Sequence, residues 1–146
     1  MSETHTGSCL CGSVRYRATE PFLDMLHCHC TDCRKAHGAA FATSIGVSRD
    51  RFAIVAGEGD LASFTTPTGT RRSFCRRCGS KIAVENDAWD ALYVPAGTID
   101  TALPHRPQLH MYVRSRVPWN EIEDGLPQFA AAPDDDYRDR IPPLRR

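Results

Sequence analysis

Short segments of alternating polar and apolar residues recur along the chain, and their period is that of half-buried strands. Residues 13–18 (SVRYRA) place Val14, Tyr16 and Ala18 on one face. Similar runs lie at about residues 24–30, 40–47, 51–56, 61–65, 70–75, 80–84, 91–95 and 109–113. No segment keeps a 3.6-residue apolar period over three turns, although helical turns around residues 33–38 and 86–91 fit the pattern. The pattern predicts a mainly β protein built of short antiparallel strands.

The length and composition fit one soluble domain. The chain has 146 residues, of which 41% are hydrophobic and 25% are charged, as in ordinary globular proteins. The longest apolar run covers only residues 52–56, far short of the ~20 residues that span a bilayer. The first residues, MSETHTGS, lack the apolar stretch of a signal peptide, so we expect a cytoplasmic protein with no membrane partner.

The charges cancel and the cysteines are unusually numerous. Eighteen basic residues balance eighteen acidic ones, which leaves no basic surface charge in excess for binding nucleic acid.

Seven cysteines are an odd number for a complete disulfide set, and a reducing cytoplasm disfavours disulfides. They fall into a CxC motif, a CxCxxC motif and a CxxC motif, which are Cys9/Cys11, Cys28/Cys30/Cys33 and Cys75/Cys78. Short-spaced thiolate groups of this kind predict metal binding.

The CxC and CxxC pairs predict one closed zinc site. Zinc takes four thiolates in a tetrahedron, and such closed sites are structural. The two sulfurs of a CxC motif on an extended chain point to the same side. A glycine follows each pair and permits the positive φ of a tight turn. We expect the four ligands to be Cys9, Cys11, Cys75 and Cys78.

The CxCxxC motif predicts a second, open site. If residues 28–30 are extended, Cys28 and Cys30 face one way while His27 and His29 face the other. Cys33 then returns to the same ion after a turn. Three protein ligands with an exchangeable fourth position are typical of catalytic zinc sites.

Several alternatives stay open from the residues alone. A histidine, whether His27, His29 or His37, can close the second site and make it structural. Thiolates alone also suit an iron–sulfur cluster. The basic residues beside the cysteines either offset thiolate charge or bind an anionic substrate; they are Arg34, Lys35, Arg71, Arg72, Arg76, Arg77 and Lys81. We interpret His110, in the predicted strand LHMYV, as a satisfied structural histidine.

The ordered combination of motifs resembles the glutathione-dependent formaldehyde-activating enzyme family, which includes centromere protein V. The matching stretches are GSCLCGSVRY (7–16), HCHCTDCRK (27–35), FCRRCGS (74–80), AGTID (96–100), and the segment from His110 through Pro118-Trp119 to DGLP (124–127). The resemblance implies two small antiparallel sheets in a tent-like β fold around two zinc sites. It implies a structural zinc on Cys9, Cys11, Cys75 and Cys78, and a catalytic zinc on Cys28, Cys30 and Cys33. The matching stretches lie in the zinc-binding domain that we expect over residues 7–132, which follows a tail over 1–6. Composition predicts a charged, proline-containing tail over 133–146.

The activity that the resemblance implies is that of a carbon–sulfur lyase acting on an adduct of a small thiol and an aldehyde. The family's founding reaction joins formaldehyde to glutathione and gives S-hydroxymethylglutathione. We therefore expect two zinc ions per chain, glutathione as a co-substrate, and a substrate thiolate bound to the open zinc. The proton donor is not identified, and His29, Asp32 and His37 lie closest in sequence. The alternative is a non-catalytic two-zinc interaction module, and the chain can be a monomer or a homodimer.

Overall fold

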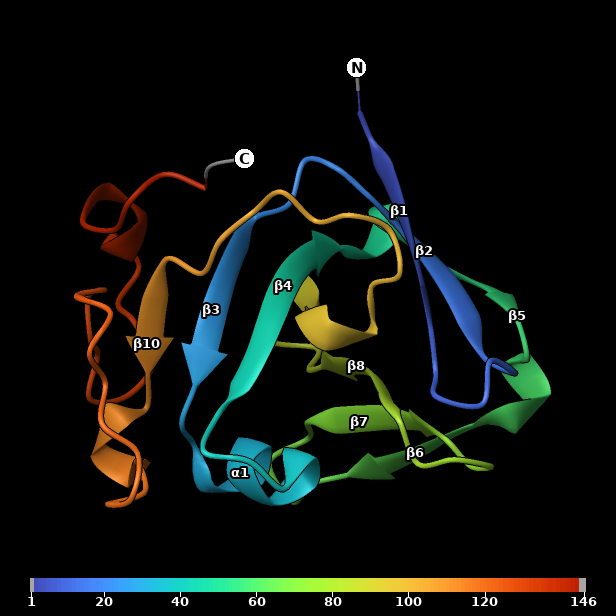
Figure 1. Cartoon of the computed structure of the whole chain (residues 1–146), viewed down its shortest axis with the longest axis horizontal. Helices are drawn as coiled ribbons and strands as arrows, with labels where there is room; N and C mark the ends of the chain where they lie inside the picture. The colour runs from blue at the N-terminus through green and yellow to red at the C-terminus, as the bar shows by residue number, and fades with distance from the viewer. Residues whose placement is uncertain (1, 145–146) are drawn as a thin grey trace. The chain divides into compact units, whose positions relative to one another are not determined.

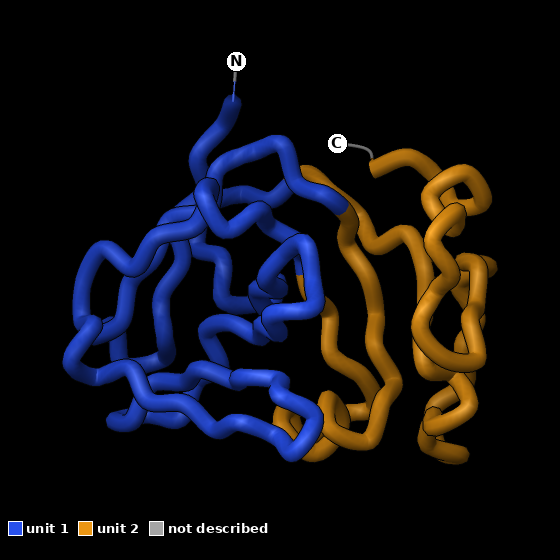
Figure 2. Tube along the Cα trace, turned by 180° about the vertical axis from the view of Figure 1, so that it is seen from behind, with its two compact units in different colours: residues 1–23, 45–103 blue, residues 24–44, 104–146 orange. Residues whose placement is uncertain are grey.

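The computed structural model describes residues 2–144, and they form two compact units. Unit 1 consists of residues 1–23 and 45–103, and unit 2 of residues 24–44 and 104–146 (Figure 2). The fold is mainly β, with a three-stranded sheet, a larger sheet, one α-helix and short 3-10 turns in the described part, as the sequence predicts. No helix among these residues has both the length and the apolar character needed to cross a lipid bilayer.

The smaller sheet lies in unit 1 and carries the first predicted strand. It joins β1 (Thr4–Ser8), β2 (Arg15–Thr19) and β5 (Phe52–Ala56) as antiparallel neighbours (Figure 1). The alternation in SVRYRA is confirmed, because Val14, Tyr16 and Ala18 are fully buried. This sheet holds the chain on both sides of the first cysteine pair.

The other strands of unit 1 form consecutive antiparallel pairs. They are β6 (Leu61–Thr65), β7 (Arg71–Cys75), β8 (Lys81–Glu85) and β9 (Ala91–Pro95). Strand β4 (Ala42–Ser48) begins in unit 2 and ends in unit 1. The core of unit 1 includes Ile45, Val47, Ile82 and Val94, all fully buried. These strands fix the position of Cys75, the last residue of β7.

Unit 2 contains the second cysteine motif on a strand and a short helix. Strand β3 (Asp24–Cys28) pairs in parallel with β10 (Leu109–Met111), a departure from the antiparallel pairing that the sequence predicts. Helix α1 (Thr31–His37) ends at Gly38, which adopts the left-handed conformation that a glycine allows at a helix end. The predicted helical turn near residues 86–91 is a non-helical turn, in which the Asn86 side chain accepts a hydrogen bond from the Ala88 backbone.

The N-terminal segment departs from its sequence-based interpretation. The sequence predicts a tail over residues 1–6, of which residue 1 lies outside the described part, but β1 begins at Thr4. Its inward side chain is His5, which is fully buried and hydrogen-bonded to Glu20 and Thr101. A polar residue carries the buried side of this strand, so hydrophobic alternation gives no sign of it.

The C-terminal segment is held more closely than its composition suggests. Its charge and proline content are typical of solvated tails, and its last two residues lie outside the described part. Nevertheless Ile141 is buried, the Tyr137 hydroxyl donates to the buried Asp24 carboxylate, and the Gln108 amide donates to the Pro142 carbonyl. All of these contacts lie within unit 2.

Gly57 provides a stability test of the backbone that supports the first cysteine pair. It has φ +74°, and a Cβ atom there would lie 1.9 Å from the Ser13 carbonyl oxygen. We expect Gly57→Ala to lower the free energy of unfolding by about 2 kcal/mol or more, from left-handed strain and this clash. Urea unfolding of the metal-loaded protein measures it.

Gly59→Ala is the matched control. A Cβ atom added at Gly59 would have no other atom within 4 Å, and the φ of this glycine is not in the left-handed region. We expect a change of less than about 0.5 kcal/mol. Equal effects of the two substitutions would show that the close approach of Gly57 to Ser13 is not a constraint on the fold.

Candidate metal centres

The first cysteine pair lies in a tight turn rather than on an extended chain. The Gly12 N–H donates to the Cys9 carbonyl over 3.0 Å, and Gly12 has φ +78°. The expected extended CxC geometry is therefore wrong. The turn replaces it because a glycine at positive φ lets the chain reverse directly after Cys11. The pair Cys75/Cys78 is also followed by a glycine in the left-handed conformation, since Gly79 has φ +81°.

The structure brings the four sulfurs of these two pairs together within unit 1. All four lie within 4.8 Å of one another. The Cys9 and Cys11 sulfurs are 3.6 Å apart, and the Cys11 and Cys75 sulfurs are 3.8 Å apart. Four zinc–sulfur bonds of ~2.3 Å in a tetrahedron place the sulfurs ~3.8 Å from one another. The donor set and its spacing thus fit a tetrahedral metal ion.

Two serines that the sequence reasoning missed line this cluster. The Ser13 hydroxyl lies 3.2 Å from the Cys11 sulfur and 3.4 Å from the Cys75 sulfur. The Ser80 hydroxyl lies 3.3 Å from the Cys78 sulfur and accepts a hydrogen bond from the Leu10 backbone. Hydrogen bonds from the Ser80 side chain and backbone lower the pKa of Cys78 to about 5, which favours the thiolate that a metal requires. The signal was present as the triplet Cys-Gly-Ser, which occurs at both pairs.

The second cluster forms in unit 2 where β3 passes into α1. Cys28 is the last residue of β3, Cys30 is the N-cap of α1 and accepts from the Cys33 N–H through sulfur, and Cys33 lies in the first turn. The three sulfurs lie within 4.8 Å of one another. The neighbouring Cys30 and Cys33 sulfurs, and then burial, raise the pKa of the Cys28 thiol far above its usual range. Three such thiols cannot ionise together unless a cation balances their charge, so the cluster can hold a metal ion.

The nearby histidines form a separate cluster of rings. The rings of His27 and His29 both contact His110 and Phe41, at centroid distances between 4.6 and 5.1 Å. Among residues 2–144, no histidine belongs to the group formed by the three sulfurs. Neither His27, His29 nor His37 is placed to complete a four-ligand set in this arrangement.

Two of these histidines and an acid form a hydrogen-bonded chain. His29 Nε2 lies 2.8 Å from His110 Nδ1, and His110 Nε2 lies 2.7 Å from Asp124 Oδ2. His29 and His110 are buried, whereas Asp124 is partly exposed. Although burial opposes ionisation, hydrogen bonds from His110 and the Leu126 backbone lower the pKa of Asp124. Asp124 belongs to the DGLP stretch, and no local pattern in the sequence indicates its place in this chain.

His29 lies at the inner end of this chain. Ionised Asp124 accepts the hydrogen of His110 Nε2. His29 Nδ1 is buried and has no hydrogen-bond partner among the described atoms. Burial, followed by the interaction with His110, lowers the pKa of His29. His29 therefore combines a hydrogen-bonded Nε2 with an Nδ1 that lacks a partner, in the segment that carries Cys28 and Cys30.

Most basic residues beside the first cluster already have protein partners. Arg71 pairs with Glu85, Arg77 with Asp60, and Arg76 donates to a backbone carbonyl. These contacts favour a structural role for them over substrate binding. On α1, Asp32 and Lys35 are exposed, and the structure gives neither a contact with the sulfurs.

Comparison with known proteins places the chain in a family. A sequence profile described as glutathione-dependent formaldehyde-activating enzyme matches residues 4–115, which include every cysteine. The chain belongs to this family. A Halomonas elongata protein, named as a candidate glutathione-dependent formaldehyde-activating enzyme, is 33% identical in an alignment 141 positions long that covers 88% of each chain. A Rhodobacter sphaeroides crystal structure matches with a TM-score of 0.57 and 23% identity over 68% of this chain and 91% of that chain. That structure supports the fold alone.

Substitution of one cysteine in each cluster separates their contributions to folding. Cys75 is fully buried and joins two segments that are distant in sequence. Because metal binding energy at such a site is folding energy, we expect Cys75→Ala to give insoluble or unfolded protein. Cys30→Ala should stay folded and keep about one metal ion per chain. Soluble yield, circular dichroism and metal analysis measure the difference, and equal folding of both variants would contradict the assigned roles.

Proposed function

We propose that the protein is a zinc-dependent enzyme of the carbon–sulfur lyase type that acts on the adduct of a small thiol and an aldehyde. Glutathione and formaldehyde are the proposed pair, in keeping with the name of the Halomonas relative. The four-cysteine cluster holds a structural zinc ion and the three-cysteine cluster a catalytic one. In the direction of synthesis the product is S-hydroxymethylglutathione.

The observation that carries this proposal is the inequality of the two clusters. One offers four sulfurs to an ion, and the other offers three with no further Cys, His, Asp or Glu from the described residues. A tetrahedral ion bound by three protein ligands keeps one position for an exchangeable ligand. A thiol is the ligand that such a position favours, because zinc prefers sulfur and stabilises thiolate.

The reaction needs no oxidant or reductant. A zinc ion at the second cluster would lower the pKa of the bound substrate thiol and polarise the aldehyde carbonyl. In synthesis, a carbon–sulfur bond forms while the carbonyl π bond breaks, and the proton lost by the thiol ends on the new hydroxyl oxygen. The chain contributes the three thiolates, and the hydrogen bonds among His29, His110 and Asp124 hold the ring of His29, the residue between Cys28 and Cys30, in one orientation.

Cobalt substitution tests the proposal through the spectrum of the second site. Replacement of zinc by cobalt gives absorption bands that report thiolate coordination. We expect reduced glutathione to change these bands with saturation, and oxidised glutathione to leave them unchanged because it has no thiol to ionise. The matched control is Cys30→Ala, in which the first cluster is intact and the change should be absent.

Two outcomes would overturn the proposal. An unchanged spectrum at millimolar glutathione, with both metals present, would favour a non-catalytic two-metal module. A response that persists in Cys30→Ala would place thiol binding elsewhere. Once thiol binding is established, loss of formaldehyde in the presence of glutathione, above the uncatalysed rate, measures the reaction itself.

A further inference from the structure

Unit 2 contains a cavity to which the proposed reaction assigns no role. Its volume is about 540 Å³, within the range of small-molecule sites. It is lined by Val113, Arg114, Arg116, Pro118, Gln128 and Ala130. These residues come from two segments that run beside each other.

The two segments are joined by backbone hydrogen bonds that fix the cavity wall. The Val113 N–H donates to the Phe129 carbonyl over 3.0 Å, and the Arg114 N–H donates to the Ala130 carbonyl over 3.2 Å. A 3-10 turn at Val113–Ser115 then directs the chain to Arg116. The side chains of Arg116 and Gln128 thus project from a backbone that is already ordered.

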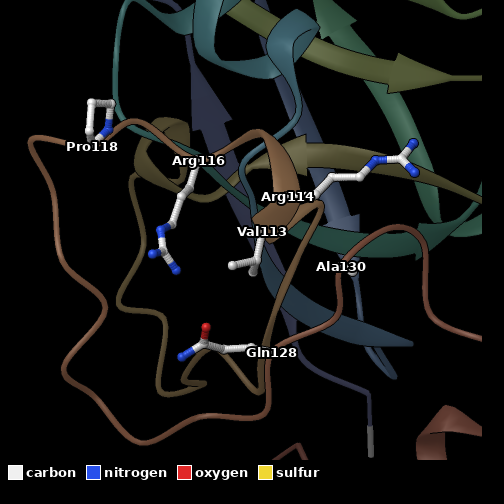
Figure 3. A pocket seen from close by; sticks show the side chains of 6 residues that line it. All are labelled: Val113, Arg114, Arg116, Pro118, Gln128 and Ala130. Atoms are coloured by element: carbon white, nitrogen blue, oxygen red, sulfur yellow. The ribbon is translucent and has the colours of Figure 1, made fainter.

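The polar tips of two lining residues point into the same space. Figure 3 shows the Arg116 guanidinium and the Gln128 amide directed into the same space, with the Val113 side chain at one side of it, whereas the Arg114 side chain extends away. The Arg114 guanidinium lies 5.8 Å from the centre of the Tyr112 ring. Arg116 is exposed and has no ion-pair partner among residues 2–144.

These groups match the end of a peptide. A guanidinium binds a carboxylate through two parallel hydrogen bonds. A glutamine side chain can both donate to and accept from a peptide amide. Val113 offers an apolar surface beside the two. A terminal carboxylate next to an amide satisfies this arrangement, and an uncharged small aldehyde does not.

We propose that this cavity binds the carboxylate end of the peptide thiol substrate, with Arg116 on the carboxylate and Gln128 on the adjacent amide. The inference rests on the proposed function, because it assigns the remote end of the same substrate. The chain that lines the cavity follows directly on β10, whose Met111 is the register partner of Cys28 in the second cysteine cluster. The Met111 carbonyl also accepts from the His29 N–H over 2.9 Å.

A ligand without a thiol tests this site separately from the reaction. S-Methylglutathione keeps both carboxylates and the amides but has no thiol to ionise. We expect the zinc-loaded protein to bind it, and Arg116→Gln to weaken binding about 10- to 100-fold, the range for a lost hydrogen-bonded charge. Calorimetric titration measures both affinities, and circular dichroism and metal content verify that the exposed substitution leaves the fold intact.

Two controls make the assignment specific. Arg114→Gln removes the same charge from the same cavity wall, but its side chain points away (Figure 3), so its affinity should stay within about twofold of the parent. The S-methyl ligand with its glycine carboxylate converted to a carboxamide should bind the parent and Arg116→Gln equally. Both results together support a carboxylate on Arg116.

Three results would overturn the site: no binding of S-methylglutathione at millimolar concentration, equal affinity of the parent and Arg116→Gln, or equal losses in Arg116→Gln and Arg114→Gln. None of them depends on thiol coordination. If glutathione still changes the cobalt spectrum, the carboxylate site is wrong and the proposed function stands. If S-methylglutathione binds through Arg116 but glutathione leaves the spectrum unchanged, the proposed reaction fails and the carboxylate site remains.

Discussion

The proximity of thiol sulfurs is the constraint on which the rest of the structure depends. Seven sulfurs gather in two groups, each within 4.8 Å, and every sulfur that ionises makes ionisation of its neighbours harder. A bound divalent cation offsets the repulsion between the thiolates, so that the cluster binds the cation favourably. In unit 1 the cation would join the turn after β1 to the end of β7. In unit 2 it would fix the junction between β3 and α1.

The two clusters differ in what surrounds them, and the difference fits different roles. Serine hydroxyls accompany the four-sulfur group and favour thiolates without opening a position for a ligand. The three-sulfur group lies on the same short segment as His29, whose Nδ1 has no partner among the described atoms. Buried polar atoms without partners are rare in stable folds and occur at functional sites. This difference supports the catalytic role that we propose for the second cluster.

Much of this arrangement can be predicted from the sequence because short-range rules govern it. Alternation in SVRYRA and cysteine spacing are local signals, and they locate β2 and both sulfur groups. Strand β1 is not predicted from the sequence, because its buried side chain is His5, which is hydrogen-bonded to side chains distant in sequence. The role of Asp124 and the parallel pairing of β10 with β3 are not predicted either, because they also depend on contacts between residues distant in sequence. The two serines could have been predicted, because the triplet Cys-Gly-Ser begins at the second cysteine of both pairs.

X-ray absorption at the metal edge, with metal analysis of protein purified without chelators, tests the central claim most directly. The claim is that one ion has four protein sulfurs and the other three plus an exchangeable ligand. The account predicts about two zinc ions per chain and an average of about 3.5 sulfurs per ion, rising toward four when glutathione is added. One ion per chain, iron in place of zinc, or an average of four sulfurs before any thiol is added would contradict it.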